Sequence, residues 1–472
     1  MAGSTKDSKE NLHVVILPYL AFGHMIPFLH LSTSLANSGI RVSFISSPKN
    51  IQRLPSPPHH LSHLIQMVQL PLPHVDGLPL GVEASTDVTT MDQSHLKIAY
   101  DLWKQPFKHF IEHDTPDWII HDSTPYWIAD IASEFNIPHI LFSVYSASVY
   151  SFFGPPEYLA DPTKYWTSPE RLSSSPEWIT FPSSVAFPSY EAPYVLAGFF
   201  GTNGSGVRDS VRVATSLRSC KAVAIRSCKE YEGQYLDLLE KLFRKPVIPI
   251  GLLPPAVPEK RECGGGAGGE EWEATFRWLD EQKPKSVVFA GFGSECKLSK
   301  EQLAEIAHGL EHSGLPFIWT LRKPMWAVDD NDALPLGFKA RTESKGKVCM
   351  GWAPQMEILA HQSIGGSLFH SGWGSIVETL QFGHTLVILP LIMDQSLNAS
   401  LLVERGLAVE VERAKDGSFE RENIARALRK AMVDEEGESV RVRAREMRKI
   451  FGDLNLQQDY IDGFVHYLKK GR

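Results

Sequence analysis

The sequence lacks a long apolar segment, a long basic run and any two cysteines separated by two residues. None of its apolar runs approaches the roughly 18–20 residues that are needed to cross a bilayer, so we expect no membrane span. Its 47 Lys and Arg stand against 55 Asp and Glu, which gives a formal charge of −8. Binding to nucleic acid needs a positive surface that releases counterions, and this balance disfavours such a partner.

The N-terminus and the cysteines indicate the compartment. The first ten residues are polar and mixed in charge, without the apolar region of a secretory signal. The cysteines are odd in number and widely scattered, and 472 residues can bury a sizeable core without a disulfide. We therefore expect reduced thiols in a cytoplasmic protein. We also expect the protein to act as a monomer. The cysteines are Cys220, Cys228, Cys263, Cys296 and Cys349.

A segment rich in proline and glycine, residues 251–271, is predicted to link two domains. Each side of it begins with a short apolar run, a loop, a segment of helical spacing and a second apolar run. In the first half the helix is predicted to open at Pro27, and in the second it follows a capping box of Ser299 and Gln302. The predicted strands span residues 12–17, 42–45, 286–290 and 317–321.

Strands that alternate with helices in this way form parallel sheets that are covered on both faces. The predicted fold class is therefore α/β, with two Rossmann-like doubly wound domains that face a cleft. The first domain is predicted to span residues 1–250 and the second residues 272–452. Residues 453–472 carry apolar side chains at helical spacing, which predicts a closing helix that packs on the first domain.

Open sheets of this kind bind ligands at the carboxyl ends of their strands. In the first half, His24 lies in the loop that follows the first predicted strand, and Asp122 follows the apolar run 118–120. If those two strands are neighbours, Asp122 can hold His24 in one tautomer and stabilise its protonated form, as in a general base. The alternative is that both are ordinary loop residues, and position alone does not decide between the two.

The second half contains a strand, residues 365–369, followed directly by glycines, hydroxyls and a helical segment. The turn begins at His370 and reaches Ser375. Free backbone N–H groups and the helix dipole make such a turn an anion site, which favours a phosphate. Glu378 lies one turn into the helix, where it can accept hydrogen bonds from a ribose diol. A merely structural turn would not explain an imidazole beside the glycines.

Two other readings are disfavoured by the sequence. Histidines cluster at residues 59–63, and His109 lies four residues before His113, but neither group has the glutamate of a zinc protease helix or the cysteines of a structural site. We therefore expect exposed histidines and no metal. The dinucleotide fingerprint G-x-G-x-x-G is missing after the first strand, where Phe22-Gly-His24 stands, so a nicotinamide dehydrogenase is not expected.

Residues 352–395 resemble the signature box of plant family 1 UDP-sugar glycosyltransferases, over 44 positions without a gap. The box contains Trp352-Ala-Pro-Gln355 and His370-Ser-Gly-Trp373, then Ser375 and Glu378, and it ends with Asp394-Gln395. Outside the box, Phe22-Gly-His24, Pro27, Asp122 and Phe292-Gly-Ser294 fit the same family, so the resemblance spans nearly the whole chain.

The resemblance implies a GT-B fold and the inverting transfer of a sugar from UDP to an acceptor hydroxyl, with no metal and no cofactor beyond the UDP-sugar. It makes His24 the general base and Asp122 its orienting partner. Trp352 would stack on uracil, Glu378 would bind the ribose, and His370 with the serines would hold the diphosphate. The residues implied to bind the UDP-sugar are Ser294, Trp352, Ala353, Gln355, His370, Trp373, Gly374, Ser375, Glu378, Asp394 and Gln395, of which Trp373, Asp394 and Gln395 would lie at the sugar.

Gly374 departs from the family pattern, in which most members have asparagine, and leaves only a backbone N–H toward the phosphate. The surrounding motifs look most like the branch that adds a sugar to a flavonoid or terpenoid glycoside. Trp373 and Gln395 resemble the pattern of members that use UDP-glucose. UDP-rhamnose or another donor, direct transfer to an aglycone, and a non-catalytic UDP-sugar binding protein stay open as alternatives. Tyr145, Phe199 and Phe200 are predicted to line the acceptor pocket, although aromatic side chains also fill cores.

Overall fold

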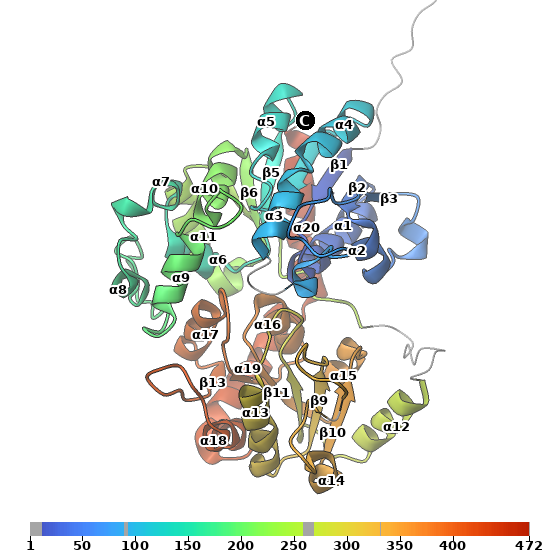
Figure 1. Ribbon diagram of the computed structural model, residues 1–472, viewed down its shortest axis with the longest axis vertical. Coiled ribbons are helices and arrows are strands. Elements are labelled where there is room, and N and C mark those ends of the chain that lie inside the picture. Colours follow the sequence, from blue (N-terminus) through green and yellow to red (C-terminus); the bar gives the residue numbers. More distant parts are fainter. Residues whose placement is uncertain (1–11, 89–92, 258–268, 331, 472) are drawn as a thin grey trace, which may run out of the picture. The chain divides into compact units, whose positions relative to one another are not determined.

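The computed structural model describes residues 12–88, 93–257, 269–330 and 332–471. The chain divides into two compact units, each of which is described by itself (Figure 1). The first unit comprises Met1–Thr167, Leu196–Leu253 and Asn455–Arg472, and the second comprises Ser168–Val195 and Pro254–Leu454. Most of the predicted linker, residues 258–268, lies outside the described residues, and its last three residues begin a helix, Gly269–Asp280.

The first unit contains a seven-stranded parallel sheet in the order β3-β2-β1-β4-β5-β6-β7. Its inner strand β1 is buried along its whole length, as expected for a parallel sheet covered on both faces. The strands are β1 His13–Leu17, β2 Arg41–Ser46, β3 Ile65–Gln69, β4 Trp118–His121, β5 His139–Ser143, β6 Ala222–Ile225 and β7 Val247–Pro249. The helices are α1 Phe22–Asn37, α2 Pro48–Arg53, α3 Gln93–Asp101, α4 Lys104–His113, α5 Ile128–Glu134, α6 Ala147–Phe153, α7 Pro156–Ala160, α10 Asp209–Ser219, α11 Lys229–Phe243 and α20 Leu454–Lys470, and α9 Ala192–Phe199 runs from the second unit into the first.

Helix α1 begins five residues earlier than predicted, at Phe22, so the prediction that Pro27 opens it is wrong. The first hydrogen bonds of the helix run from the N–H groups of His24 and Met25 to the carbonyl of Ala21, and Pro27 lies inside the helix. A proline so near a helix start removes one hydrogen bond, here the one to the carbonyl of Gly23, and the helix continues. His24 therefore lies in the first turn of a helix and not in a loop.

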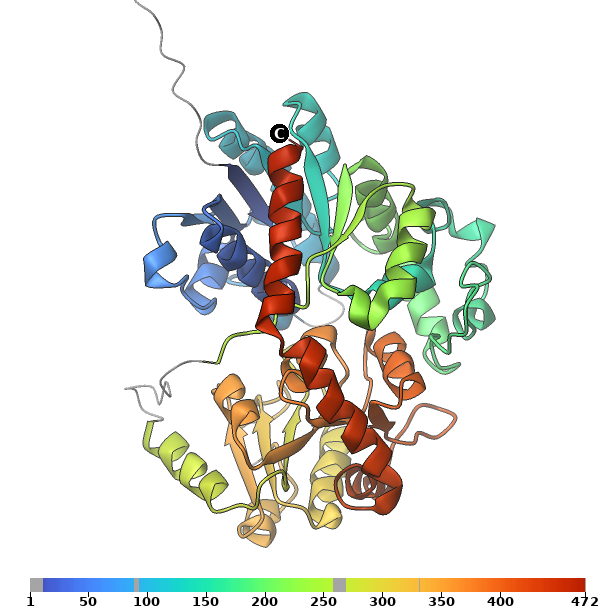
Figure 2. The same ribbon diagram turned by 180° about the vertical axis from the view of Figure 1, so that it is seen from behind.

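The C-terminal helix α20 packs on the first unit, where Figure 2 shows it along the sheet. Its buried side chains Ile461, Phe464 and Leu468 join the core cluster that contains Val14 of β1. The indole N–H of Trp118 donates to the carbonyl of Leu468 over 3.1 Å. The last helix of the chain is thus part of the core that supports β1 and β4.

The second unit contains a six-stranded parallel sheet in the order β10-β9-β8-β11-β12-β13. Helix α13 begins with the predicted capping box, in which Gln302 N–H donates to Ser299 Oγ over 3.2 Å. The strands are β8 Val287–Gly291, β9 Phe317–Leu321, β10 Gly346–Met350, β11 Ile364–Phe369, β12 Thr385–Ile388 and β13 Ala408–Glu410. The helices are α8 Pro169–Leu172, α12 Gly269–Asp280, α13 Lys300–Ser313, α14 Phe338–Thr342, α15 Gln355–Ala360, α16 Trp373–Leu380, α17 Gln395–Glu404, α18 Arg421–Met432 and α19 Glu438–Phe451.

Residues 168–195 belong to the second unit, although the sequence places them in the first domain. Their side chains bond to α17: Ser184 Oγ donates to Glu404 over 2.8 Å, and Ser396 Oγ donates to Glu191 over 2.6 Å. Contacts over more than 200 residues of sequence leave no local pattern, so the boundary could not be read from periodicity. The two parallel-sheet units confirm the predicted α/β class with two Rossmann-like domains. Among the described residues, no helix is both long and apolar enough to cross a bilayer.

Candidate active site

His24 and Asp122 meet at one edge of the first sheet. Strand β1 pairs in parallel with β4, with Leu17 opposite His121, so the segments that follow these strands begin side by side. The imidazole Nδ1 of His24 lies 2.6 Å from Asp122 Oδ2. The condition set by the sequence, that the two strands are neighbours, is therefore met.

Asp122 is buried, with 2% of its surface exposed, and donors surround its carboxylate. The N–H of Tyr19 donates to Oδ2 over 3.3 Å, and the N–H of Ser123 donates to Oδ1 over 2.7 Å. Burial alone would raise the pKa of Asp122, but the charge and hydrogen bond of His24, together with these backbone donors, lower the pKa below its usual value. The ionised carboxylate can only accept, so in the neutral imidazole of His24 the proton lies on Nδ1 and Nε2 presents a lone pair.

Tyr145 is the predicted acceptor-pocket residue that the structure brings to His24. Its hydroxyl lies 3.2 Å from His24 Nε2, and its ring meets the imidazole edge to face, 5.4 Å between centroids. The other two predicted pocket aromatics lie in a cluster of rings. The ring centroid of Phe199 is 4.8 Å from that of Phe153, and the ring centroid of Phe200 is 5.6 Å from that of Trp166. The sequence suggested Tyr145 as a pocket aromatic and gave no signal for its hydrogen bond to the base.

The predicted donor residues of the second unit follow its strands at their carboxyl ends. Ser294 follows β8, Trp352 follows β10, His370 follows β11 and Asp394 follows β12. Because the sheet is parallel, all these segments leave from the same edge. The indole of Trp352 is 65% exposed, which leaves a flat face on which a base can stack.

Helices α15 and α16 are joined by a hydrogen bond between two predicted donor residues. Gln355 is the first residue of α15, and its Nε2 donates to Glu378 Oε2 over 2.6 Å. Gly374 and Ser375 lie in the first turn of α16, where backbone N–H groups have no partner within the helix. Half-buried Ala353 stands next to Trp352 in the connection from β10 to α15. The arrangement offers hydrogen-bond acceptors, N–H groups and a stacking face at one sheet edge.

His370 lies between two glycines that leave room for its ring. A Cβ at Gly293, where φ is +69°, would lie 2.8 Å from His370 Cε1, and one at Gly372 would lie 2.6 Å from Nε2. Burial lowers the pKa of His370 to about 4, against a smaller opposing effect of the Gly291 carbonyl. The imidazole is therefore neutral near pH 7, with one N–H to donate. Its neighbour Ser371, at φ +59°, donates from Oγ to the carbonyl of Gln395 over 2.9 Å.

Two residues predicted to lie at the sugar, Trp373 and Gln395, are largely buried in the second unit. Trp373 is 4% exposed, and its ring meets Phe451 of α19 edge to face at 6.3 Å. Gln395 is 5% exposed, and its Oε1 accepts the N–H groups of Leu391 and Ile392 over 2.8 and 2.9 Å. Gln395 thereby fixes the backbone of its loop. Asp394, half-buried beside them, accepts a hydrogen bond from Asn398 over 2.7 Å.

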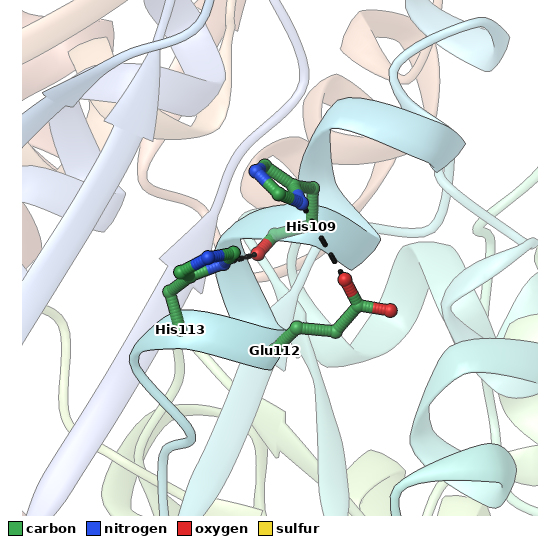
Figure 3. Close-up of side chains that lie close together, drawn as sticks. All are labelled: His109, Glu112 and His113. Atoms are coloured by element: carbon green, nitrogen blue, oxygen red, sulfur yellow. Dashed lines mark hydrogen bonds and ion pairs between the residues drawn. The ribbon is translucent and has the colours of Figure 1, made fainter.

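One group of three side chains among the described residues could approach a metal ion. Figure 3 shows His109, Glu112 and His113 on the last turn of α4, with ligand atoms within 4.8 Å of one another. All three are exposed, and Nδ1 of His113 donates to the carbonyl of His109 over 2.8 Å. Catalytic metal centres are shielded and supported by further side chains, so we assign this group no part in the reaction.

An imidazole–carboxylate pair at the edge of one Rossmann-like sheet, and an anion-type turn with an exposed indole at the edge of another, define the class of GT-B glycosyltransferases. The solved structure of UGT89C1 from Arabidopsis thaliana in complex with UDP-L-rhamnose shares this fold. It matches with a TM-score of 0.73 and 25% identity, over 97% of this chain and 99% of that one.

Comparison of sequences identifies the family. Residues 277–442 match the family model of UDP-glucoronosyl and UDP-glucosyl transferases. UDP-glycosyltransferase 91C1 of Arabidopsis thaliana is 39% identical over 98% of this chain and 97% of its own. Soyasaponin III rhamnosyltransferase of Glycine max is 40% identical over 99% of this chain and 97% of its own. The chain belongs to the plant UDP-glycosyltransferases and is an enzyme that transfers a sugar from a UDP-sugar to small molecules.

Proposed function

We propose that the enzyme transfers a sugar, with inversion, to a hydroxyl on the sugar of a glycosylated small molecule such as a flavonoid or terpenoid glycoside. The observation that carries the proposal is the 2.6 Å contact of His24 Nδ1 with Asp122, which makes Nε2 the nitrogen that accepts a proton. The acceptor oxygen forms a bond with C1 of the donor sugar while its proton moves to Nε2. The bond from C1 to the diphosphate oxygen breaks, and UDP leaves. Asp122 stabilises the imidazolium that forms.

The diphosphate binds in this proposal to His370, Ser375 and Ser294, and to the N–H groups at the start of α16. Those N–H groups and the helix dipole stabilise the negative charge that develops as UDP departs. Gly374 contributes its N–H alone, and close approach of the phosphate is sterically open there. The chain has a net charge of −8, so binding of an anion depends on these local groups.

The nucleoside binds in this proposal to Trp352, Ala353, Gln355 and Glu378. Uracil stacks on the exposed indole, and the ribose hydroxyls donate to Glu378. The hydrogen bond from Gln355 supports this assignment, because it holds the Glu378 carboxylate in one orientation. Asp394 accepts from a sugar hydroxyl, and the buried Gln395 holds the backbone beside it.

We propose UDP-glucose as the donor, on the pattern of Trp373 and Gln395. UDP-L-rhamnose is the second candidate, because the Glycine max relative is named a rhamnosyltransferase and UGT89C1 was solved with that nucleotide sugar. Rhamnose is a 6-deoxy sugar of the L series, so it lacks the hydroxyl at C6 of glucose and also presents its ring hydroxyls in a different arrangement.

The decisive experiment offers each of these donors with an aglycone and its monoglycoside, and detects products by mass. A gain of one sugar on the monoglycoside supports the proposal, and a gain only on the aglycone contradicts the acceptor class. His24→Ala should abolish transfer and keep UDP binding, and EDTA should change neither. Tight UDP-sugar binding without transfer or hydrolysis would instead identify a non-catalytic binding protein. We also expect a cytoplasmic monomer, which cell fractionation and size-exclusion chromatography test.

A further inference from the structure

The hydroxyl of Tyr145 lies where an acceptor hydroxyl has to lie. A hydroxyl that is to be deprotonated by His24 must donate to Nε2, because Nδ1 donates to the ionised Asp122. The Tyr145 hydroxyl is 3.2 Å from that nitrogen and is a donor of the required kind. Nε2 offers one lone pair, so Tyr145 and an acceptor compete for the same position.

The backbone that carries Tyr145 is fixed on both sides. Ser143 Oγ accepts the N–H of Tyr145 over 3.2 Å and donates to its carbonyl over 3.1 Å. Two residues further on, the N–H groups of Ala147 and Ser148 donate to the buried carboxylate of Glu232 over 3.1 and 2.8 Å. The phenol can therefore leave Nε2 by a rotation of the side chain while the backbone stays in place.

Two aromatic rings flank the imidazole. The rings of Tyr19 and Tyr145 both meet the imidazole edge to face, with distances between ring centroids of 5.8 and 5.4 Å. The His24 side chain is only 14% exposed as a result. With the Tyr145 hydroxyl removed and its ring retained, the space left at Nε2 is about the size of one water molecule.

We propose that the Tyr145 hydroxyl closes Nε2 of His24 to water while no acceptor is bound, and so suppresses hydrolysis of the UDP-sugar. The inference rests on the proposed role of His24 as the base. In the suppressed reaction a water oxygen bonds to C1 of the sugar and its proton moves to Nε2. The bond from C1 to the diphosphate oxygen breaks, and free sugar and UDP are released. An acceptor hydroxyl displaces the phenol, because the rest of the acceptor contributes binding energy that water lacks. Tyr145 is thus a positioning residue that selects acceptor over water.

The test compares Tyr145→Phe with wild type for two rates: release of free sugar from the UDP-sugar without acceptor, and transfer with acceptor. We expect hydrolysis to rise about fivefold, the change that removal of one hydrogen bond of ordinary net strength gives. The KM for the acceptor should fall by a similar factor, with kcat of transfer within about twofold. Tyr467→Phe is the matched control, because it removes a hydroxyl of the same kind from the same unit, beside Trp118 at the start of β4, 6.0 Å between ring centroids. It should leave hydrolysis at the wild-type level.

The double variant His24→Ala with Tyr145→Phe separates the inference from the proposed function. If water uses His24, the gain in hydrolysis disappears in the double variant. Hydrolysis in Tyr145→Phe equal to wild type, or a loss of kcat with an unchanged KM, would overturn the inference and leave the proposed function standing. Full transfer activity in His24→Ala alone would overturn the proposed function itself.

Discussion

Replacement of Asp122 by asparagine should remove most of the turnover without unfolding the protein. Four hydrogen bonds reach the carboxylate, from His24 Nδ1, the N–H of Tyr19, and the N–H and Oγ of Ser123, and every one of them has the carboxylate as acceptor. An asparagine of the same shape has one accepting oxygen and one donating nitrogen. One side of the site therefore loses its acceptor whichever way the amide is turned.

Each orientation of the amide damages the base differently. If the nitrogen faces His24, the imidazole must accept at Nδ1, and its proton moves to Nε2, where it blocks proton transfer from the acceptor. If the nitrogen faces Ser123, His24 keeps its tautomer, but the imidazolium loses an ionised partner in a site where Asp122 is 2% exposed. We expect kcat to fall by about 10²–10⁴-fold, which corresponds to about 3–5 kcal/mol of lost transition-state stabilisation.

The assay is the initial rate of transfer at saturating donor and acceptor, together with calorimetric titration of UDP and the unfolding midpoint. Asp117→Asn is the matched control, because Asp117 precedes the same strand β4 that Asp122 follows, and its carboxylate accepts the backbone N–H of His13 over 2.8 Å. It should leave kcat unchanged. An Asp122→Asn variant that keeps more than about a tenth of wild-type kcat would refute the assignment of a general base to this pair.

Three further outcomes follow from the second unit and from burial. Glu378→Ala should weaken UDP about tenfold or more in calorimetric titration, because it removes charged hydrogen bonds to the ribose, and unchanged affinity would contradict that role. Gly372→Ala should lower UDP affinity at least tenfold, since its Cβ would lie 2.6 Å from His370 Nε2, whereas Gly463→Ala has open space and should not change it. Burial lowers the pKa of His121 to about 4 in the folded protein. As the pH falls below about 6.5, the imidazole is therefore protonated in the unfolded chain before it is protonated in the folded protein. The free energy of unfolding should therefore decrease between pH 6.5 and 4, by about 2 kcal/mol at pH 5 from this group, and denaturant titrations of His121→Gln should show a smaller decrease.

The sequence alone could predict the parts of the site that depend on local order. Strand, turn and helix start follow one another within ten residues at His370, and the capping box at Ser299 needs only four. For His24 and Asp122 it could state only a condition, because 98 residues separate them and strand neighbours leave no mark on local periodicity.

Tertiary contacts orient several side chains whose surroundings the sequence alone could not predict. Trp373 packs on Phe451, which lies 78 positions further along the chain, and Gln395 folds back on the N–H groups of its own loop. A motif fixes which residue type stands at a position, and the surrounding packing decides which way its side chain points. The hydroxyl of Tyr145 on His24 belongs to the same category, since it comes from a loop 121 residues away.

In both sheets the proposed site residues follow the strands at which the strand order reverses. Strand β1 lies between β2 and β4, and β8 lies between β9 and β11, so each sheet has one such reversal near its centre. Connections on the two sides of a reversal leave in different directions, which opens a crevice at the strand ends. His24 and Asp122 follow the two strands at the first reversal, and Ser294 and His370 follow those at the second.

The reversal also makes the active site depend on strand register. Leu17 lies opposite His121 at the end of β1 and β4, which brings the next residue, Asp122, within reach of the first turn of α1. Successive side chains of a strand point to opposite faces, so a slip of one residue in this pair would turn the carboxylate away from the imidazole. Insertion of one residue within β4 should therefore abolish transfer even though His24, Asp122 and every donor residue are unchanged. UDP binding, which we propose for residues of the second unit, should survive that insertion, and its loss would show that the two units do not fold independently.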